Sequence, residues 1–137
     1  MPYLKAIDVD DEFVDEIWNR VSTSGSYYSI GDGVSKNVFR QMLFGSFVLK
    51  GDGLVLRLDV KGNEIEIHPM IFGPSAFRYA KEALGEVKEF FPESAICVII
   101  PEGMRGAKRL AMAAGMKEAG KYSRPLSGVI IQCSIWR

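Results

Sequence analysis

The stretch between Asn63 and Met116 decides the fold, and it begins with Glu64-Ile-Glu-Ile-His-Pro69. Two isoleucines alternate with charged residues there, which predicts a strand with one apolar face. A second run, Ala95-Ile-Cys-Val-Ile-Ile100, is apolar throughout, as in strands that are covered on both faces. Apolar residues at helical spacing lie between the two runs and again after the second. The stretch therefore predicts a βαβα unit that contains a locally parallel pair of strands.

Turn residues and helix caps divide the rest of the chain into elements. Asp52-Gly53 between two apolar runs is typical of a hairpin. Ser35 is a suitable N-cap for a helix that directs Val38 inward. The predicted strands are 3–7, 46–49, 54–60, 64–68, 95–100, 117–123 and 128–136, the predicted helices are 10–22, 35–44, 74–91 and 104–114, and 23–34 is a predicted loop.

These elements follow one another in the order β-α-α-β-β-β-α-β-α-β-β. Short turns between strands two, three and four predict an antiparallel meander with one apolar face, whereas helices flank the fifth strand. We therefore expect an α/β (α+β) fold with a mixed, mostly antiparallel sheet of about seven strands and four helices. At 137 residues, we expect one domain over residues 1–137.

Composition excludes several classes of protein. Hydrophobic residues make up 47% of the chain and charged residues 25%, which is ordinary for a globular domain. The formal net charge is zero, so no basic field indicates a nucleic-acid partner. No apolar run approaches the roughly 20 residues of a membrane span, and the first residues do not resemble a signal peptide. We expect a cytoplasmic protein.

Cysteine and histidine usage favours neither a disulfide framework nor a metal site. Cys97 and Cys133 both fall in apolar strand-like runs and lack CxxC spacing, so they are interpreted as buried free thiols rather than as a disulfide or metal pair. His68 is the single histidine, which argues against a histidine-rich metal site and against a Ser-His-Asp triad.

Several motifs resemble the GNAT N-acyltransferase superfamily. Ile67-His68-Pro69 matches the end of that family's fourth strand, which reads apolar-x-His/Asn-Pro. The strand Ala95–Ile100, Ala107 in the next helix and the pair Gly115-Met116 match later positions. The form Glu-Ile-His-Pro, followed later by Ile-Pro-Glu, is also similar to GNAT-like proteins encoded by bacteriophages and prophages. If a phage encodes the protein, the likeness implies a location in the host cytoplasm or in a virion. The likeness implies a GNAT-like fold and is sharpest over residues 63–123.

The resemblance implies acetyl-CoA as the co-substrate and a small-molecule or protein amine as the acceptor. In that family the turn after the fourth strand holds the pyrophosphate on backbone N–H groups at a helix N-terminus. By this likeness, Gly73, Ser75 and Ala76 hold phosphate, Arg78 neutralises it, and Pro69, Met70 and Ile71 pair through their backbone with the pantetheine arm.

Acyl transfer also needs a base for the amine proton, and an acid often protonates the leaving thiolate. Glu66 and His68 project from one face of the predicted strand, so they are the base candidates. Tyr122 is the candidate acid, with Tyr27 and Tyr28 in the loop as further choices. A solvent-facing polar stripe also accounts for Glu66 and His68, and packing or surface roles account for the tyrosines.

Other positions depart from the family's pattern and favour a second hypothesis. Phe72 stands where arginine is usual, Ala111 where the acid tyrosine often lies, and Met104 where an early asparagine is usual. The alternative is a GNAT-fold structural or interaction protein without catalysis, such as a component of a phage virion with a protein partner. The positions of the Phe72 and Phe77 rings discriminate between the two hypotheses. Rings that fill the cleft between the fourth and fifth strands would exclude coenzyme A, whereas rings that point into the core would leave this cleft open.

Overall fold

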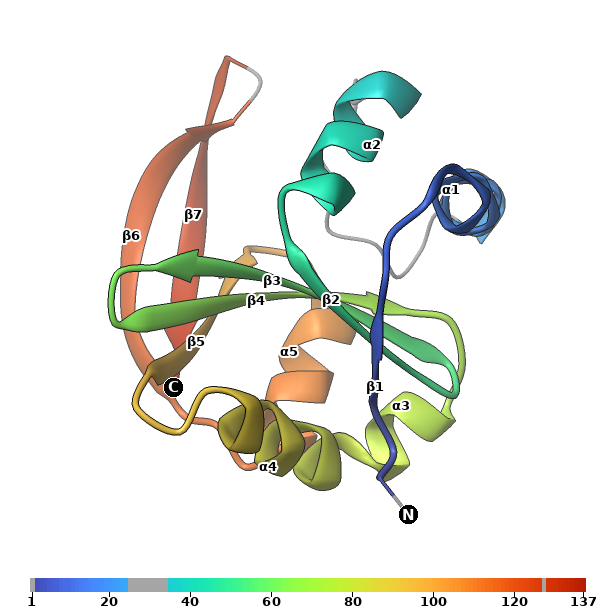
Figure 1. Cartoon of the computed structure of the whole chain (residues 1–137). Helices are drawn as coiled ribbons and strands as arrows, with labels where there is room; N and C mark the ends of the chain where they lie inside the picture. The colour runs from blue at the N-terminus through green and yellow to red at the C-terminus, as the bar shows by residue number, and fades with distance from the viewer. Residues whose placement is uncertain (1, 25–34, 127) are drawn as a thin grey trace.

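A computed structural model describes residues 2–24, 35–126 and 128–137, and seven strands within these ranges form one sheet (Figure 1). Across the sheet the strands lie in the order β1-β2-β3-β4-β5-β7-β6. The strands are β1 (Lys5–Ile7), β2 (Phe47–Gly51), β3 (Leu54–Lys61), β4 (Glu64–Ile71), β5 (Ala95–Pro101), β6 (Glu118–Leu126) and β7 (Val129–Trp136). The predicted mixed, mostly antiparallel α/β fold is confirmed.

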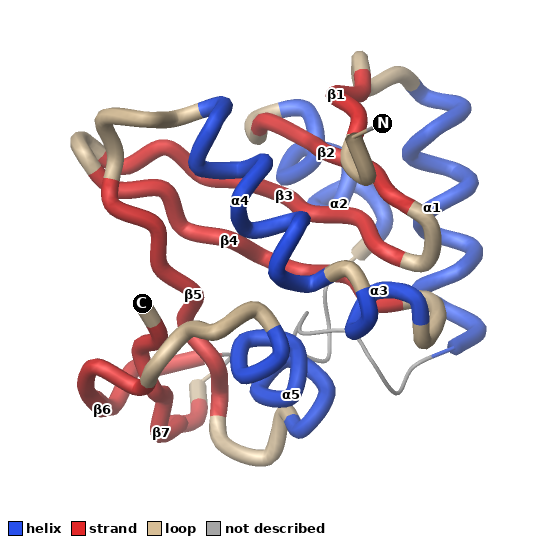
Figure 2. Tube along the Cα trace, turned by 90° about the horizontal axis from the view of Figure 1, so that it is seen from below, coloured by secondary structure: helices blue, strands red, loops and turns tan. Residues whose placement is uncertain are grey.

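Helices cover both faces of this sheet. Figure 1 shows α1 and α2 on one face and α3, α4 and α5 on the other, and Figure 2 views the second face directly. The helices in the described ranges are α1 (Asp11–Ser24), α2 (Lys36–Phe44), α3 (Ser75–Arg78), α4 (Ala80–Phe90) and α5 (Arg105–Ala113).

The parallel pair predicted from the central stretch is β4 and β5. Their pairing runs from Glu64 opposite Ala95 to Ile67 opposite Val98, and it goes no further. Beyond that point β4 stays paired with β3 up to Ile71, while β5 pairs with β7. Pro69 has no N–H to donate, and it lies just after the last β4–β5 pair. The two strands therefore separate at their carboxyl ends.

The β3–β4 hairpin places two cross-strand pairs of ionisable residues next to each other. The turn Lys61-Gly-Asn63 confirms the predicted reversal and sets a register in which Arg57 lies opposite His68 and Asp59 opposite Glu66. Directly opposed side chains on one face of an antiparallel pair lie within contact distance. Four ionisable residues therefore share one face of the sheet, the face covered by α1 and α2.

Two apolar cores lie on the two faces. The core under α3, α4 and α5 contains the leucines of β3, the isoleucines of β4 and the alanines of α4 and α5. The smaller core lies under α1 and α2 and is built around Phe39, Leu43, Val55 and Met70. Since both faces are covered, the prediction that the meander has a single apolar face was wrong.

Two local predictions also need correction. The predicted helix 74–91 divides at Tyr79, whose φ of −101° and ψ of 14° leave the helical region and whose ring stacks on Tyr3 with centroids 4.8 Å apart. Ser35 caps α2 by accepting the Val38 N–H, but Val38 is 45% exposed rather than inward. Tyr27 and Tyr28 lie outside the described residues.

Candidate active site

The turn that follows β4 is braced by the β2–β3 hairpin. The Phe72 N–H donates to the Gly53 carbonyl at 2.7 Å. The Ser75 hydroxyl donates to the Asp52 carbonyl at 2.9 Å, and the Tyr3 hydroxyl donates to the same oxygen. The Ser75 hydroxyl, which the sequence suggested as a phosphate donor, is therefore engaged in holding this turn.

Two backbone N–H groups of the same turn have no hydrogen-bond acceptor among the described residues. The N–H groups of Ala76 and Phe77, in the first turn of the short helix α3, donate to the carbonyls of Gly73 and Pro74, which precede that helix. Within the described part of the chain, no hydrogen bond is formed by the N–H groups of Gly73 and Ser75. Unpaired amides of this kind attract an anion. The turn thus offers two N–H donors, fewer than the glycine-rich turn of the GNAT pattern.

The predicted cofactor residues lie together at the carboxyl end of β4 and in α3. Pro69, Met70 and Ile71 occupy the β4 segment that has left β5, so their outer backbone edge has no neighbouring strand. Ala76 is buried, whereas Arg78 is exposed and has no ion-pair partner among the residues that the structure describes. Arg78 is therefore available to neutralise an anion.

An apolar groove lies between α4 and α5, over Ile67 and Val98. Alanines of both helices line it, and one of them is Ala111, which stands where the GNAT pattern often has a tyrosine. Its free volume is only about 40 Å³. A ligand arm the size of pantetheine requires α4 and α5 to move apart.

Phe72 and Phe77, which were expected to discriminate between the two functional hypotheses, pack on opposite faces of the sheet. Phe72 packs against the core under α1 and α2, and the Arg20 guanidinium lies 4.1 Å from its ring centroid. Phe77 packs against the core on the other face, with the Arg109 guanidinium 4.5 Å from its ring centroid. Neither ring lines the groove. The free N–H groups of Gly73 and Ser75, with Arg78, therefore fit the anionic end of coenzyme A. The pantetheine arm fits only if the groove widens.

The base candidates Glu66 and His68 do lie together, in a buried polar cluster. His68 Nε2 lies 3.1 Å from Glu66 Oε1 and 3.2 Å from Asp59 Oδ2. Among the described residues this buried nitrogen forms no hydrogen bond of good geometry, so it sits between two carboxylates without a directed bond to either. Glu66 is 4% exposed, which rules out the solvent-facing stripe as its environment.

Charges from β3 complete the cluster. Arg57 is buried and contacts both carboxylate oxygens of Asp59 at 2.9 Å. Lys61 Nζ lies 2.7 Å from Glu66 Oε2, and this hydrogen bond raises the pKa of the Lys61 ammonium. The sequence pattern did not predict that Arg57, Asp59 and Lys61 belong to this cluster. The hairpin register was the available signal, because it sets Arg57 and Asp59 opposite His68 and Glu66.

The environment adjusts the protonation of this cluster. Burial, followed by the charge of Arg57, lowers the pKa of His68 below 6.5, although Glu66 and Asp59 act in the other direction. Burial raises the pKa of Asp59, but the Ser46 hydrogen bond and the Arg57 charge outweigh it, so the pKa lies below its usual value. His68 is therefore neutral near pH 7, as a proton acceptor must be.

Tyr122, the third predicted catalytic residue, does not join the cluster. It lies on β6, and both β5 and β7 intervene between that strand and β4. Cys97 lies beside the cluster, but burial and its hydrogen bond to Glu64 raise the pKa of its thiol to about 12. A thiol with so high a pKa is a poor nucleophile near pH 7. The chemistry of this site thus depends on carboxylates and imidazole.

The described residues contain no helix that is long and apolar enough to cross a membrane. They also contain no group of three or more His, Cys, Asp or Glu side chains arranged to hold a metal ion.

Comparison with known proteins supports the fold through solved structures alone. No protein-family model matches the sequence, and no curated protein matches it either. Many solved structures resemble it at low sequence identity. These likenesses therefore concern the arrangement of the backbone.

Three of these structures come from bacteria. The acetyl transferase from Salmonella typhimurium that modifies the N-terminal serine of ribosomal protein L7/L12 has a TM-score of 0.75 at 11% identity, over 99% of this chain and 94% of its own. A GNAT-family acetyltransferase from Bacillus anthracis has a TM-score of 0.70 at 15% identity, over 98% and 93% of the two chains. Spermidine N-acetyltransferase from Vibrio cholerae, solved with CoA and spermine, has a TM-score of 0.66 at 14% identity, over 98% and 94%. The chain therefore has the fold of the GNAT acetyltransferases.

Proposed function

We propose that this protein is an N-acyltransferase that moves an acetyl group from acetyl-CoA to an amine. The observation that carries the proposal is the separation of β4 from β5 after Ile67 and Val98, next to a buried Glu66–His68 pair on β4. The likeness to N-acetyltransferase structures supports it. The co-substrate implies action in the cytoplasm.

The donor would be held at the end of β4. The free N–H groups of Gly73 and Ser75 and the guanidinium of Arg78 would bind its phosphates, because unpaired amides and a cation both favour an anion. The unpaired edge from Pro69 to Ile71 would bind the amides of the pantetheine arm. The groove between α4 and α5 would open to admit the arm.

The chemistry would be a direct transfer. The amine nitrogen attacks the thioester carbonyl carbon, the carbon–sulfur bond breaks, and the thiolate leaves with the bonding electron pair. His68, which is neutral near pH 7, takes the proton that the amine loses. The resulting imidazolium would lie between the carboxylates of Glu66 and Asp59, which stabilise its positive charge.

Calorimetry with acetyl-CoA, together with thioester consumption in the presence of a panel of amines, tests this proposal. We expect binding, and turnover with at least one amine. Glu66→Gln should lower kcat by about 10²-fold or more, because it removes a carboxylate that would stabilise the imidazolium of His68 during the transfer. Glu64→Gln is the matched control, because Glu64 precedes Glu66 on the same face and pairs with Arg137. No binding at millimolar acetyl-CoA would reject the proposal.

A second candidate is a GNAT-fold protein that no longer catalyses and instead binds a protein partner, in a virion if a phage encodes it. The narrow groove and Ala111 favour it, because the fold's binding space is nearly filled and its usual acid is missing. It predicts a stable complex with a protein partner and no thioester consumption. Turnover by a monodisperse, partner-free preparation would count against it.

A further inference from the structure

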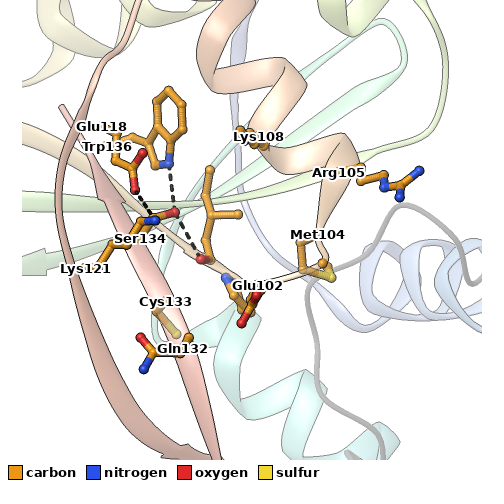
Figure 3. A pocket seen from close by; sticks show the side chains of 13 residues that line it. Glu102, Met104, Arg105, Lys108, Glu118, Lys121, Gln132, Cys133, Ser134 and Trp136 are labelled. Atoms are coloured by element: carbon orange, nitrogen blue, oxygen red, sulfur yellow. Dashed lines mark hydrogen bonds and ion pairs between the residues drawn. The ribbon is translucent and has the colours of Figure 1, made fainter.

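A second and larger cavity lies between the start of α5 and the strands β6 and β7. Its volume is about 530 Å³, within the range of small-molecule sites. Figure 3 shows its two walls, with Met104, Arg105 and Lys108 coming from α5 and its approach, and Lys121, Ser134 and Trp136 from β6 and β7. The groove and the cavity have no lining residue in common. Nothing in the proposed transfer reaction uses this cavity.

The base of the cavity is apolar and rigidly held. Ile100 and Trp136 are both more than nine-tenths buried and belong to the core under α3, α4 and α5. The Trp136 indole N–H donates to Ser134 Oγ at 2.9 Å, and Ser134 Oγ donates to the Ile100 carbonyl at 3.4 Å. These bonds occupy the polar groups of the base, so what it offers to a ligand is an apolar surface.

Cations outnumber carboxylates around this base. Arg105 and Lys108 line the cavity, and neither has an ion-pair or hydrogen-bond partner for its side chain within the described ranges. Lys121, on the opposite wall, approaches Glu118 at only 3.7 Å and is 73% exposed. Glu102 is the other carboxylate of the lining. Among the described residues, Arg105 and Lys108 are unpaired cations and Glu102 is an unpaired carboxylate. The lining therefore carries an excess of positive charge on the side of α5.

In Figure 3 the Arg105 guanidinium lies at the end of the site remote from Trp136, with Lys108 on the same helix. The residues are three apart on α5, which puts them on neighbouring positions of one helix face. An elongated ligand could therefore lay an apolar part against Ile100 and Trp136 while its charged end reaches the cations. Charge-assisted hydrogen bonds to carboxylate or phosphate are the strongest contacts that such cations form.

We propose that this cavity binds a small organic anion, whose apolar body rests on Trp136 and Ile100 and whose carboxylate or phosphate is held by Arg105 and Lys108. The site is distinct from the proposed acyl-CoA site, since α5 contributes different side chains to the two and they share no lining residue. The proposal does not depend on acyl transfer, and it holds equally if the protein is not an enzyme.

Fluorescence of Trp136 tests the proposal. The chain has two tryptophans, so Trp18→Phe leaves Trp136 as the single indole emitter. The full-length variant is titrated with phenylacetate, phenyl phosphate and, as a neutral probe of similar size, benzyl alcohol. We expect a saturable change in emission with at least one acid, at a Kd on the order of 1 mM or lower, as ligands of this size can reach. The preferred acid identifies the head group.

Two further variants, made in the Trp18→Phe background, examine the role of charge. Arg105→Gln combined with Lys108→Gln should weaken binding of the acid about tenfold or more, since it removes both charge-assisted contacts. Lys88→Gln on α4 is the matched control and should leave binding unchanged, because Lys88 is an exposed cation outside the cavity.

Three results would overturn the proposal. One is the absence of a saturable signal with either acid, and another is equally tight binding of benzyl alcohol. The third is an unchanged Kd in the double variant, provided that thermal unfolding shows it to be folded.

Discussion

The Arg109 guanidinium lies 4.5 Å from the centroid of the Phe77 ring and so joins α5 to α3. Phe77 also packs against the core on which α4 and α5 rest. A movement of α5 away from α3 must break this contact. The pair therefore opposes the widening of the groove that an acyl-CoA arm requires.

Replacement of Arg109 by glutamine should make donor binding easier. An exposed cation–π contact is worth about 0.5–1 kcal/mol, so its loss should raise the affinity for acetyl-CoA about two- to five-fold. Calorimetry measures the change. Arg40→Gln is the matched control, because Arg40 lies 4.6 Å from the Phe44 ring centroid on α2, on the other face of the sheet. Weaker binding by Arg109→Gln would mean that Arg109 contacts the ligand instead.

The β2–β3 turn should tolerate no side chain at Gly53. Gly53 has a φ of +71°, and a Cβ there would lie 2.7 Å from Ser75 Oγ and 3.2 Å from Gly73 Cα. Gly62 has a φ of +61°, but a Cβ there would meet nothing within 4 Å. Gly62→Ala should therefore lower the free energy of unfolding by about 1 kcal/mol from backbone strain alone.

Gly53→Ala should cost about 1–2 kcal/mol more than Gly62→Ala, since it adds a steric conflict with the turn after β4. Urea unfolding of both variants measures the difference. Equal losses would show that this turn moves aside freely, and it would then be a poor frame for holding phosphate.

Loss of the Asp59 charge should destabilise the fold, because Arg57 would keep its charge inside the protein. The Arg57 side chain is 9% exposed and the Asp59 side chain 27%. Asp59→Asn should lower the free energy of unfolding by about 3 kcal/mol, as is typical when one member of a buried ion pair is removed.

Asp11→Asn provides the comparison on the surface, because Asp11 is 74% exposed and pairs with Arg40. We expect it to change the free energy of unfolding by less than about 0.5 kcal/mol. Similar losses for the two variants would indicate that water reaches Arg57 and satisfies it.

The stability of the protein should fall when the pH drops below 6.5. Burial lowers the pKa of His68 below that value in the folded protein, so the unfolded chain binds its proton first as the pH falls. The contribution of His68 is therefore complete above pH 6.5 and declines as the pH falls toward its folded pKa. Asp59 acts in the same direction, but only below its usual value of 3.8.

Urea unfolding at pH 7.5, 6.5, 5.5 and 5.0 measures this dependence. Because His68 is the single histidine of the chain, His68→Gln should remove most of the slope in this range. A wild-type protein that becomes more stable between pH 6.5 and pH 5.5 would show that the fold favours protonated His68.

Local sequence was sufficient for the elements that depend on nearest neighbours. Asp52-Gly53 and Lys61-Gly-Asn63 predicted two reversals because turn geometry is decided within a few residues. The continuous apolar run at Ala95 predicted a strand covered on both faces. The separation of β4 from β5 at Pro69 was not predicted, although a residue without an N–H cannot extend that ladder.

Burial of polar side chains could not be predicted in the same way. Alternation correctly placed Glu66 and His68 on the face opposite Ile65 and Ile67, but it also allowed that face to be open to solvent. Glu66 is instead enclosed, and it contacts Lys61 and His68. Whether a sheet face meets water depends on helices packed on it from elsewhere in the chain.

The sequence by itself determined the order of the elements, the parallel pair at its centre and the residues that share each strand face, because these follow from backbone periodicity and local turn chemistry. The tertiary structure decided which residues form a site. Arg57 and Asp59 reach His68 across a hairpin, Phe77 meets Arg109 between two helices, and α5 meets Trp136 of the last strand. Such contacts join residues far apart in the chain, and their geometry is fixed by packing of the whole domain rather than by any local pattern.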